Sequence, residues 1–239
     1  MANLVGIILI ATGKYNRFIQ PLLDSADKFF FEGKNVDVYL FADKEFRGEA
    51  PARMSLIYIN IPHLPWPYPT LYRYKWITEN KNVITSDYVF YMDVDMLFVG
   101  KVDSEIIPTK QGLTAVRHPG FHARGGWGDN KTTVNSTAYM HPSLRKTYYA
   151  GGFQGGQRDM YLLACEIMAK GIATDEGKCV VAGWQDESHW NCYLWSRPHL
   201  DLTPSYCMVE EMELRVKWLI ATLQPKILAL KKNHQELRS

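Results

Sequence analysis

Tyr88-Val89-Phe90-Tyr91-Met92-Asp93-Val94-Asp95 is the stretch of sequence that decides the fold of this chain. It begins with five apolar residues in a row, which is typical of a strand covered on both faces of a parallel sheet. Alternation along the strand would place the carboxylates of Asp93 and Asp95 on the same side. Ligands of open α/β sheets bind at the carboxyl ends of strands, and hard divalent cations prefer oxygen ligands. Two acids in a solvated turn would give the same Asp-x-Asp pattern, but the preceding apolar run favours a metal site in a cleft.

Strands and helices are predicted to alternate through the first part of the chain. Continuous or dense apolar runs predict strands at Leu4–Ile10, Val36–Phe41 and Ser55–Ile61. Helical spacing of apolar residues predicts a helix within 18–33, and Thr70 is a candidate cap for a helix running to about residue 80. This alternation predicts an α/β sandwich with a mostly parallel central sheet.

The second half of the chain is less regular. It predicts a strand at Gly112–Arg117, a glycine-rich loop at His118–Asn135, and helices at Gln157–Lys170 and Asp186–Trp195. The tail, Lys231–Ser239, is basic and polar and has the pattern of a frayed terminus.

Composition indicates one globular domain spanning residues 1–239. The chain is 46% hydrophobic and shows no repeat or low-complexity linker. Its formal net charge of +2 gives no reason to expect a nucleic-acid partner. The four cysteines fit no zinc-binding spacing and are expected to be reduced thiols.

The apolar run Leu4–Ile10 is too short to span a membrane and lacks the basic flank of a signal peptide. No later stretch of about 18 apolar residues follows. The chain is therefore expected to be soluble and cytoplasmic, with no membrane span.

Adjacent acids at Asp186 and Glu187 form a second candidate cluster within Trp184–His189. A carboxylate beside an anomeric carbon can act as a nucleophile or stabilise an oxocarbenium-like centre. Acids are also favoured at a helix N-terminus, so the local pattern fits either role.

The segment Ala150-Gly151-Gly152-Phe153-Gln154-Gly155-Gly156 allows a close approach of backbone, because glycine has no side chain. Its spacing fits neither a Walker loop nor a dinucleotide fingerprint. A tight turn is the simplest local interpretation.

Taken in order, these motifs resemble glycosyltransferase family 6, which includes the blood group A and B transferases and the α-1,3-galactosyltransferase. The resemblance runs from about Leu4 to Arg238. It rests on Gly13-Lys14-Tyr15, Tyr91–Asp95, His118–Phe121, Ser136–Tyr139, Tyr148–Gly156, Trp184 with Asp186–His189, Leu202–Tyr206, and Lys232–Gln235 with Arg238. It implies a GT-A fold and transfer of N-acetylgalactosamine or galactose from UDP to the 3-hydroxyl of a β-galactoside acceptor, with retention of the α configuration.

The resemblance also implies roles for individual residues. The implied donor-binding residues are Ala11, Thr12, Tyr15, Arg73, Ala150, Gly151, Gly152, Asp186, Lys232 and Arg238. Within this set, residues 11, 12 and 15 would hold uracil, residues 150–152 would discriminate the 2-substituent of the sugar, and the two tail cations would grip the diphosphate. Asp93 and Asp95 would bind Mn²⁺ or another divalent cation, Glu187 would be the nucleophile, and His118 and Trp184 would contact the acceptor.

Several positions depart from the family pattern. The chain keeps Asp-x-Asp, whereas many bacterial members carry Asn-x-Asn, so metal dependence is expected. Departures at Asn130–Thr133, Gln185 and Met208–Glu210 all fall on the acceptor side. The small residues Ala150 and Gly152 favour N-acetylgalactosamine over galactose.

Two other functions compete with transfer. A degraded acceptor site would make the chain a UDP-sugar hydrolase. A non-enzymatic carbohydrate-binding module would use the aromatic residues alone, but it would need neither acid cluster.

Overall fold

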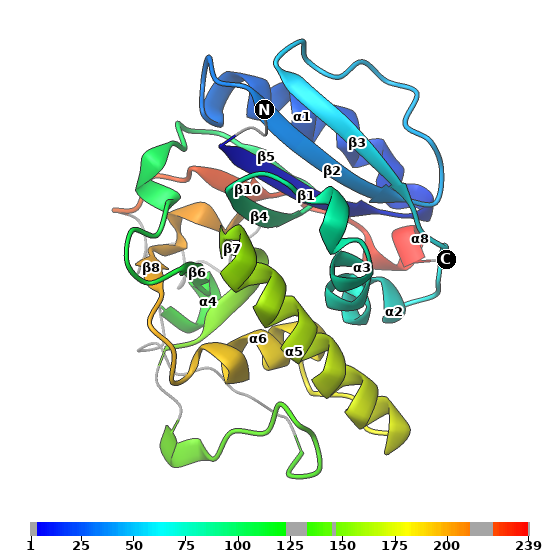
Figure 1. The fold of residues 1–239 in the computed structure, drawn as a ribbon, viewed down its shortest axis with the longest axis vertical. Coiled ribbons are helices and arrows are strands. Elements are labelled where there is room, and N and C mark those ends of the chain that lie inside the picture. The colour runs from blue at the N-terminus through cyan, green and yellow to red at the C-terminus, as the bar shows by residue number, and fades with distance from the viewer. Residues whose placement is uncertain (1–3, 123–132, 145–146, 211–221, 239) are drawn as a thin grey trace.

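The computed structural model describes residues 4–122, 133–144, 147–210 and 222–238. These residues form a seven-stranded sheet in the order β3-β2-β1-β4-β7-β6-β8 (Figure 1). The strands are β1 (Val5–Ala11), β2 (Val36–Ala42), β3 (Met54–Asn60), β4 (Tyr88–Asp93), β6 (Leu113–Arg117), β7 (Tyr149–Gln157) and β8 (Leu200–Leu202). Strands β3, β2, β1 and β4 run parallel, β7 is antiparallel to both of its neighbours, and β8 is parallel to β6. The prediction of an α/β fold with a mostly parallel sheet is confirmed.

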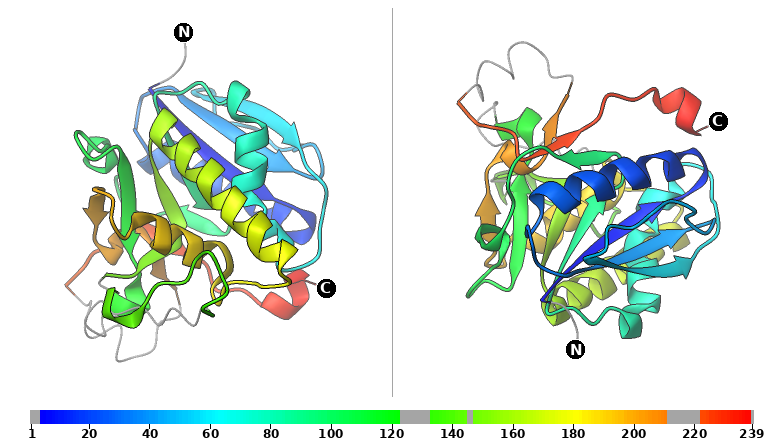
Figure 2. Two further views of the ribbon diagram at one scale, coloured as in Figure 1. Left: turned by 60° about the horizontal axis from the view of Figure 1, so that its bottom comes forward. Right: turned by 90° about the horizontal axis from the view of Figure 1, so that it is seen from above.

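Helices cover both faces of this sheet. Side chains of β1 alternate between two cores, with Val5, Ile7 and Leu9 on one side and Ile8 and Ile10 on the other. Helix α1 (Ile19–Phe29) packs on the first face, and α3 (Arg73–Glu79) and α5 (Arg158–Gly177) lie on the second (Figure 2). Helix α6 (Gln185–Leu194) packs beside α5 and β7. Burial on both faces explains the continuous apolar runs of the central strands.

A small second sheet brings the C-terminal segment to the end of β4. Its strand order is β5-β10-β9, with β5 (Met96–Phe98), β9 (Met208–Val209) and β10 (Ile227–Ala229). Just beyond β10, the Leu230 amide donates to the Asp95 carbonyl at 2.9 Å. These strands, like β8, were not predicted, because runs of two or three residues carry no periodic signal.

The helix predicted from Thr70 begins earlier and is broken. Helix α2 (Tyr68–Leu71) starts after Pro67, so Thr70 lies within it and caps nothing, and α3 follows after Tyr72. Proline suits the first turn of a helix because its missing N–H would have no partner there.

Other boundaries also differ from the prediction. The Gly-rich segment 150–156 is not a tight turn: it lies within β7, between β4 and β6, and the neighbouring backbone leaves no room for a side chain at Gly155 or Gly156. A Cβ on Gly155 would lie 2.2 Å from the Val89 carbonyl. The predicted loop after residue 117 begins with α4 (Pro119–His122), and residues 123–132, including most of the departure at 130–133, lie outside the described residues.

All four cysteines are free thiols, and Cys165 and Cys207 are buried. Within the described ranges, no helix combines the length and apolarity needed to cross a bilayer. The single-domain organisation and the cytoplasmic location stay predictions from the sequence.

Candidate active site

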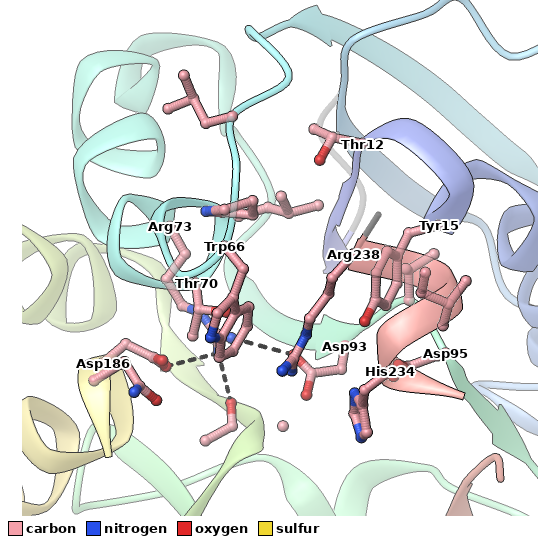
Figure 3. Close-up of a pocket in the computed structure, with 18 of the residues that line it drawn as sticks. Thr12, Tyr15, Trp66, Thr70, Arg73, Asp93, Asp95, Asp186, His234 and Arg238 are labelled. Carbon is pink, nitrogen blue, oxygen red and sulfur yellow. Dashed lines mark hydrogen bonds and ion pairs between the residues drawn. The ribbon is translucent and has the colours of Figure 1, made fainter. Parts of the chain in front are cut away.

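A pocket of about 310 Å³ lies at the carboxyl ends of β1 and β4, where the Asp-x-Asp pair is found (Figure 3). Its walls come from the segment 63–73, from Gly151 and Gly152 of β7, from the start of α6, and from the C-terminal segment. A concave site of this size at a strand edge is typical of small-ligand binding in α/β proteins.

Asp93 and Asp95 both line this pocket, but strand alternation is not the reason, because β4 ends at Asp93 and Asp95 lies in the turn before β5. Asp93 is the last residue of β4 and its side chain is 38% exposed, whereas that of Asp95 is 4% exposed. The Tyr91 hydroxyl donates to Asp93 Oδ1 at 2.6 Å. One carboxylate is therefore open to a ligand, and the other is held at the pocket floor.

Arg73 joins the acids on the two sides of the pocket (Figure 3). Its guanidinium lies 3.3 Å from Asp93 and 3.1 Å from Asp186, and it donates to the Gly151 carbonyl at 2.8 Å. Burial opposes its charge, but Asp186, Tyr91 and Asp93 together hold the pKa of Arg73 well above its ordinary value.

Glu187 is held against β7 by the backbone amide of Gly151. The Gly151 amide donates to Glu187 Oε2 at 2.7 Å, while the Gly151 carbonyl accepts from Arg73 and from Gln154. A Cβ on Gly151 would lie 3.3 Å from both Asp186 Oδ2 and Glu187 Cβ. Glycine at this position therefore lets the start of α6 approach the strand closely.

Asp186 is buried beside this contact, in the first turn of α6. Burial raises the pKa of Asp186 to about 7, and the charges of Asp93 and Glu187 act in the same direction against Arg73. The acid pair thus lies at a helix N-terminus and also lines the pocket, and its catalytic role stays a prediction.

The C-terminal segment is ordered over the pocket, which contradicts the prediction of a frayed tail. Lys232 contacts the carboxylate of Asp95, and the guanidinium of Arg238, in α8 (His234–Arg238), stacks 3.5 Å from the ring centroid of Trp66. Lys14 donates to the Glu236 carbonyl at 2.8 Å. Burial lowers the pKa of Lys232, and Arg238 adds to this effect while Asp93 opposes it. The tail cations therefore lie where a polyanion in the pocket would meet them.

The residues at the Asp-x-Asp pair fit a hard divalent cation in chemical type. Two carboxylates supply oxygen ligands, and a Cβ at Gly152 would fill space 3.0 Å from Asp93 Oδ2. No cluster of three or more His, Cys, Asp or Glu side chains able to hold a metal occurs among the described residues. These two carboxylates would therefore provide part of the coordination shell of a bound cation.

Comparison with known families shows to which family a chain with such a pocket belongs. The model of glycosyltransferase family 6 matches residues 1–239 of this chain.

The chain belongs to glycosyltransferase family 6.

Relatives in family 6 come from animals and bacteria. The chain is 31% identical over 214 residues to globoside α-1,3-N-acetylgalactosaminyltransferase 1 of Mus musculus, covering 84% of this chain and 60% of that protein. It is 28% identical over 246 aligned residues to histo-blood group ABO system transferase 1 of Rattus norvegicus, covering 98% and 68%. It is 27% identical over 214 residues to the O-antigen biosynthesis glycosyltransferase WbnI of Escherichia coli, covering 87% and 88%. The chain thus spans about three fifths of the mouse protein. The mostly parallel α/β sheet agrees with the GT-A fold expected for family 6.

Most positions carried over from family 6 meet in the pocket. They are Thr12, Tyr15, Arg73, Asp93, Asp95, Gly151, Gly152, Trp184, Asp186, Glu187, Lys232 and Arg238. Ala11 and Ala150 are instead buried in the core on the α1 face. His118 packs against Phe121 and Tyr148, outside the set that lines the pocket.

The segment after β3 lines the pocket, which the sequence did not predict. Four of its residues line the pocket: His63, Trp66, Pro69 and Thr70. The Arg238 guanidinium stacks on the ring of Trp66. The four prolines between residues 62 and 69 predict only a rigid loop there. Its position directly after a parallel strand was the available signal, because the carboxyl ends of such strands share one edge.

Replacing Arg73 tests how much the stability of the chain depends on this buried cation. Arg73→Met leaves Asp93, Asp186 and Glu187 together without a buried counter-charge, and is expected to lower the free energy of unfolding by about 3–5 kcal/mol. Adding Asp186→Asn should recover part of that loss. Urea unfolding measures both effects.

Arg117→Met is the matched control, because its ion pair with Asp201 has side chains that are 40% and 30% exposed. Its cost is expected to stay below about 1 kcal/mol. Equal costs for the two arginine variants would contradict the buried-charge argument.

Proposed function

We propose that this chain is a glycosyltransferase that takes a hexose from a nucleotide-sugar donor. The contact between Glu187 and the Gly151 amide carries the proposal, because it fixes an acid at the wall of a pocket that also contains Arg73, Lys232 and Arg238. An acid beside cations suits a donor whose sugar becomes positive as its diphosphate departs. Membership of family 6 supports the same chemistry.

The proposed reaction is retaining. N-acetylgalactosamine or galactose moves from UDP to the 3-hydroxyl of a β-galactoside acceptor and forms an α linkage. The name of the mouse relative, globoside α-1,3-N-acetylgalactosaminyltransferase 1, supports N-acetylgalactosamine as the sugar and the α-1,3 linkage.

The pocket offers a binding group for each part of the donor. Tyr15 and Thr12 provide the wall for uracil, and the buried fork of Arg73 can donate to sugar hydroxyls. Lys232 and Arg238 stabilise the negative charge that grows on the diphosphate as the glycosidic bond breaks. Trp184 is 40% exposed at the start of α6 and offers a flat apolar face to the acceptor sugar.

Glu187 stabilises the positive anomeric centre from the α6 side. Retention then follows either from a covalent sugar–Glu187 intermediate or from acceptor attack on the face that the diphosphate leaves. Its position against Gly151 is compatible with both routes.

The proposed cofactor is Mn²⁺ or another divalent cation. Asp93 and Asp95 would hold it, and when bound it would supply positive charge to the diphosphate.

N-acetylgalactosamine is the proposed donor sugar. Gly152 lines the pocket, and any side chain there would project toward Asp93, Met96 and Cys207. Glycine therefore avoids a 3.0 Å contact with Asp93 Oδ2, and the space that stays free beside this carboxylate is where we propose that the acetamido group lies. Ala150 is buried, so its small size can act only through the packing of β7.

Glu187→Gln tests the proposed reaction. The amide oxygen can still accept from Gly151, so the fold and UDP binding should persist, while kcat for transfer to a β-galactoside should fall by at least about 100-fold. Glu79→Gln is the control, because the Glu79 side chain is 56% exposed in a surface pair with Lys75. Unchanged turnover in Glu187→Gln would refute the assignment.

Metal dependence can be measured by calorimetric titration of UDP. Excess EDTA should weaken UDP binding by about 10-fold or more, and added Mn²⁺ should restore it, because the cation neutralises diphosphate charge. Asp93→Asn should lose this response, whereas Asp159→Asn, at a side chain that is 75% exposed, should keep it. Full transferase activity in excess EDTA would overturn the metal proposal.

Donor choice is tested by comparing kcat/KM for the two UDP-sugars. Wild-type protein should prefer UDP-N-acetylgalactosamine. Gly152→Ala should shift the ratio toward UDP-galactose by about 10-fold, since one methyl group in a pocket changes discrimination by this order. A clearly higher kcat/KM of the wild type for UDP-galactose would contradict the proposed donor.

A further inference from the structure

Asn191 lies one helical turn after Glu187 in α6, and both polar atoms of its side chain form hydrogen bonds. The residue is 3% exposed. Its Oδ1 accepts from the Tyr149 amide at 2.8 Å, and its Nδ2 donates to the Tyr149 carbonyl at 2.8 Å and to the Glu187 carbonyl at 2.9 Å. Both amide protons and the amide oxygen therefore have partners.

These bonds attach the helix to β7 at a second point. Strand β4 pairs with β7 only as far as Phe153. Beyond that residue, side chains of α6 bond to the β7 backbone, with Glu187 at Gly151 and Asn191 at Tyr149. Residues four apart on a helix lie on one face, so a single face of α6 meets two positions that are two residues apart on the strand.

The start of α6 needs such a support. Gln185 has a φ of +46°, a conformation that costs free energy in a residue other than glycine. The Trp184 amide donates to the Ser188 hydroxyl at 3.0 Å, and this bond lies within the first turn of the helix. Besides the ion pair of Asp186 with Arg73, the two bonds of Asn191 to Tyr149 tie this part of α6 to the strand that carries Gly151.

From this geometry we infer that Asn191 is a positioning residue that sets the Glu187 carboxylate against Gly151. The inference rests on the proposed function for the catalytic role of Glu187. The bonding that it describes is independent of that role.

Helix α6 has other anchors, so its fold should survive the loss of Asn191. Trp190 and Leu194 are fully buried in the core on the α5 face. His189 Nε2 lies 3.6 Å from Asp175 Oδ2, which also accepts from the Ser136 hydroxyl. Removal of Asn191 should loosen the register of α6 on β7 without detaching the helix.

The chain contains a matched control. The Asn80 side chain donates to the carbonyl four residues back, that of Trp76, at 2.9 Å, just as Asn191 does to Glu187. Asn80→Ala therefore removes an equivalent intrahelical bond at a distance from the pocket. Asn191→Asp is the conservative partner of Asn191→Ala, because it keeps an acceptor for the Tyr149 amide but loses both donated bonds.

Amide hydrogen exchange measured by NMR is the first test. Asn191→Ala should speed exchange at the Gly151 amide by about 10-fold or more, although Asn191 makes no bond to it, and Asn80→Ala should leave it unchanged. Asn191→Asp should give an intermediate rate. A Gly151 amide that stays fully protected in Asn191→Ala overturns the inference, whatever the activity of the chain.

Transfer kinetics are the second test. In Asn191→Ala, kcat should fall by about 100-fold, while KM for the UDP-sugar changes by less than about threefold, because a misplaced reacting group affects the transition state more than donor binding. If Asn191→Ala fails to fold, Asn191→Asp decides both tests. A kcat within about threefold of the wild type overturns the inference. A wild type that transfers no sugar, with Gly151 exchange still accelerated in the variants, removes the proposed function and leaves the positioning of Glu187 intact.

Discussion

A permanently charged arginine, buried between acids that come from separate parts of the chain, is the constraint on which the site depends. The side chain of Arg73 is only 6% exposed, and a buried charge without partners would cost several kcal/mol. Asp93 at the end of β4 and Asp186 at the start of α6 provide those partners. The sheet and the helix must therefore meet around Arg73 before its charge can be accommodated, and the same meeting forms the pocket.

Gly151 extends this constraint from side chains to backbone. Its carbonyl is held by Arg73 and its amide by Glu187, so one residue of β7 links the cation to the proposed catalytic acid. A side chain at this position would push against the first turn of α6. The sequence alone suggested a turn for these glycines, because a glycine-rich run looks the same whether it bends or lets two elements approach closely.

The sequence predicted the parallel half of the sheet well, because strands buried on both faces carry long apolar runs, as at Val36–Ala42. It also identified the acids and cations of the site, through motifs whose order matched family 6. It could not predict the short strand β10 or the ordered tail, because both depend on contacts with residues far away in the chain. Nor could it separate Thr12, which lines the pocket, from its neighbour Ala11, which lies in the core, since that difference depends on strand register.

The bond between Lys14 and Glu236 joins residues that are 222 positions apart. Such contacts form late, because the intervening chain must be ordered before its ends can meet. On a ribosome, most of the sheet can fold while the tail is still being made. Asp95 can gain Lys232 only after another 137 positions of chain have been made, and Trp66 gains Arg238 later still. The order in which the chain is made thus places the strands of the large sheet before the two cations that close the pocket wall.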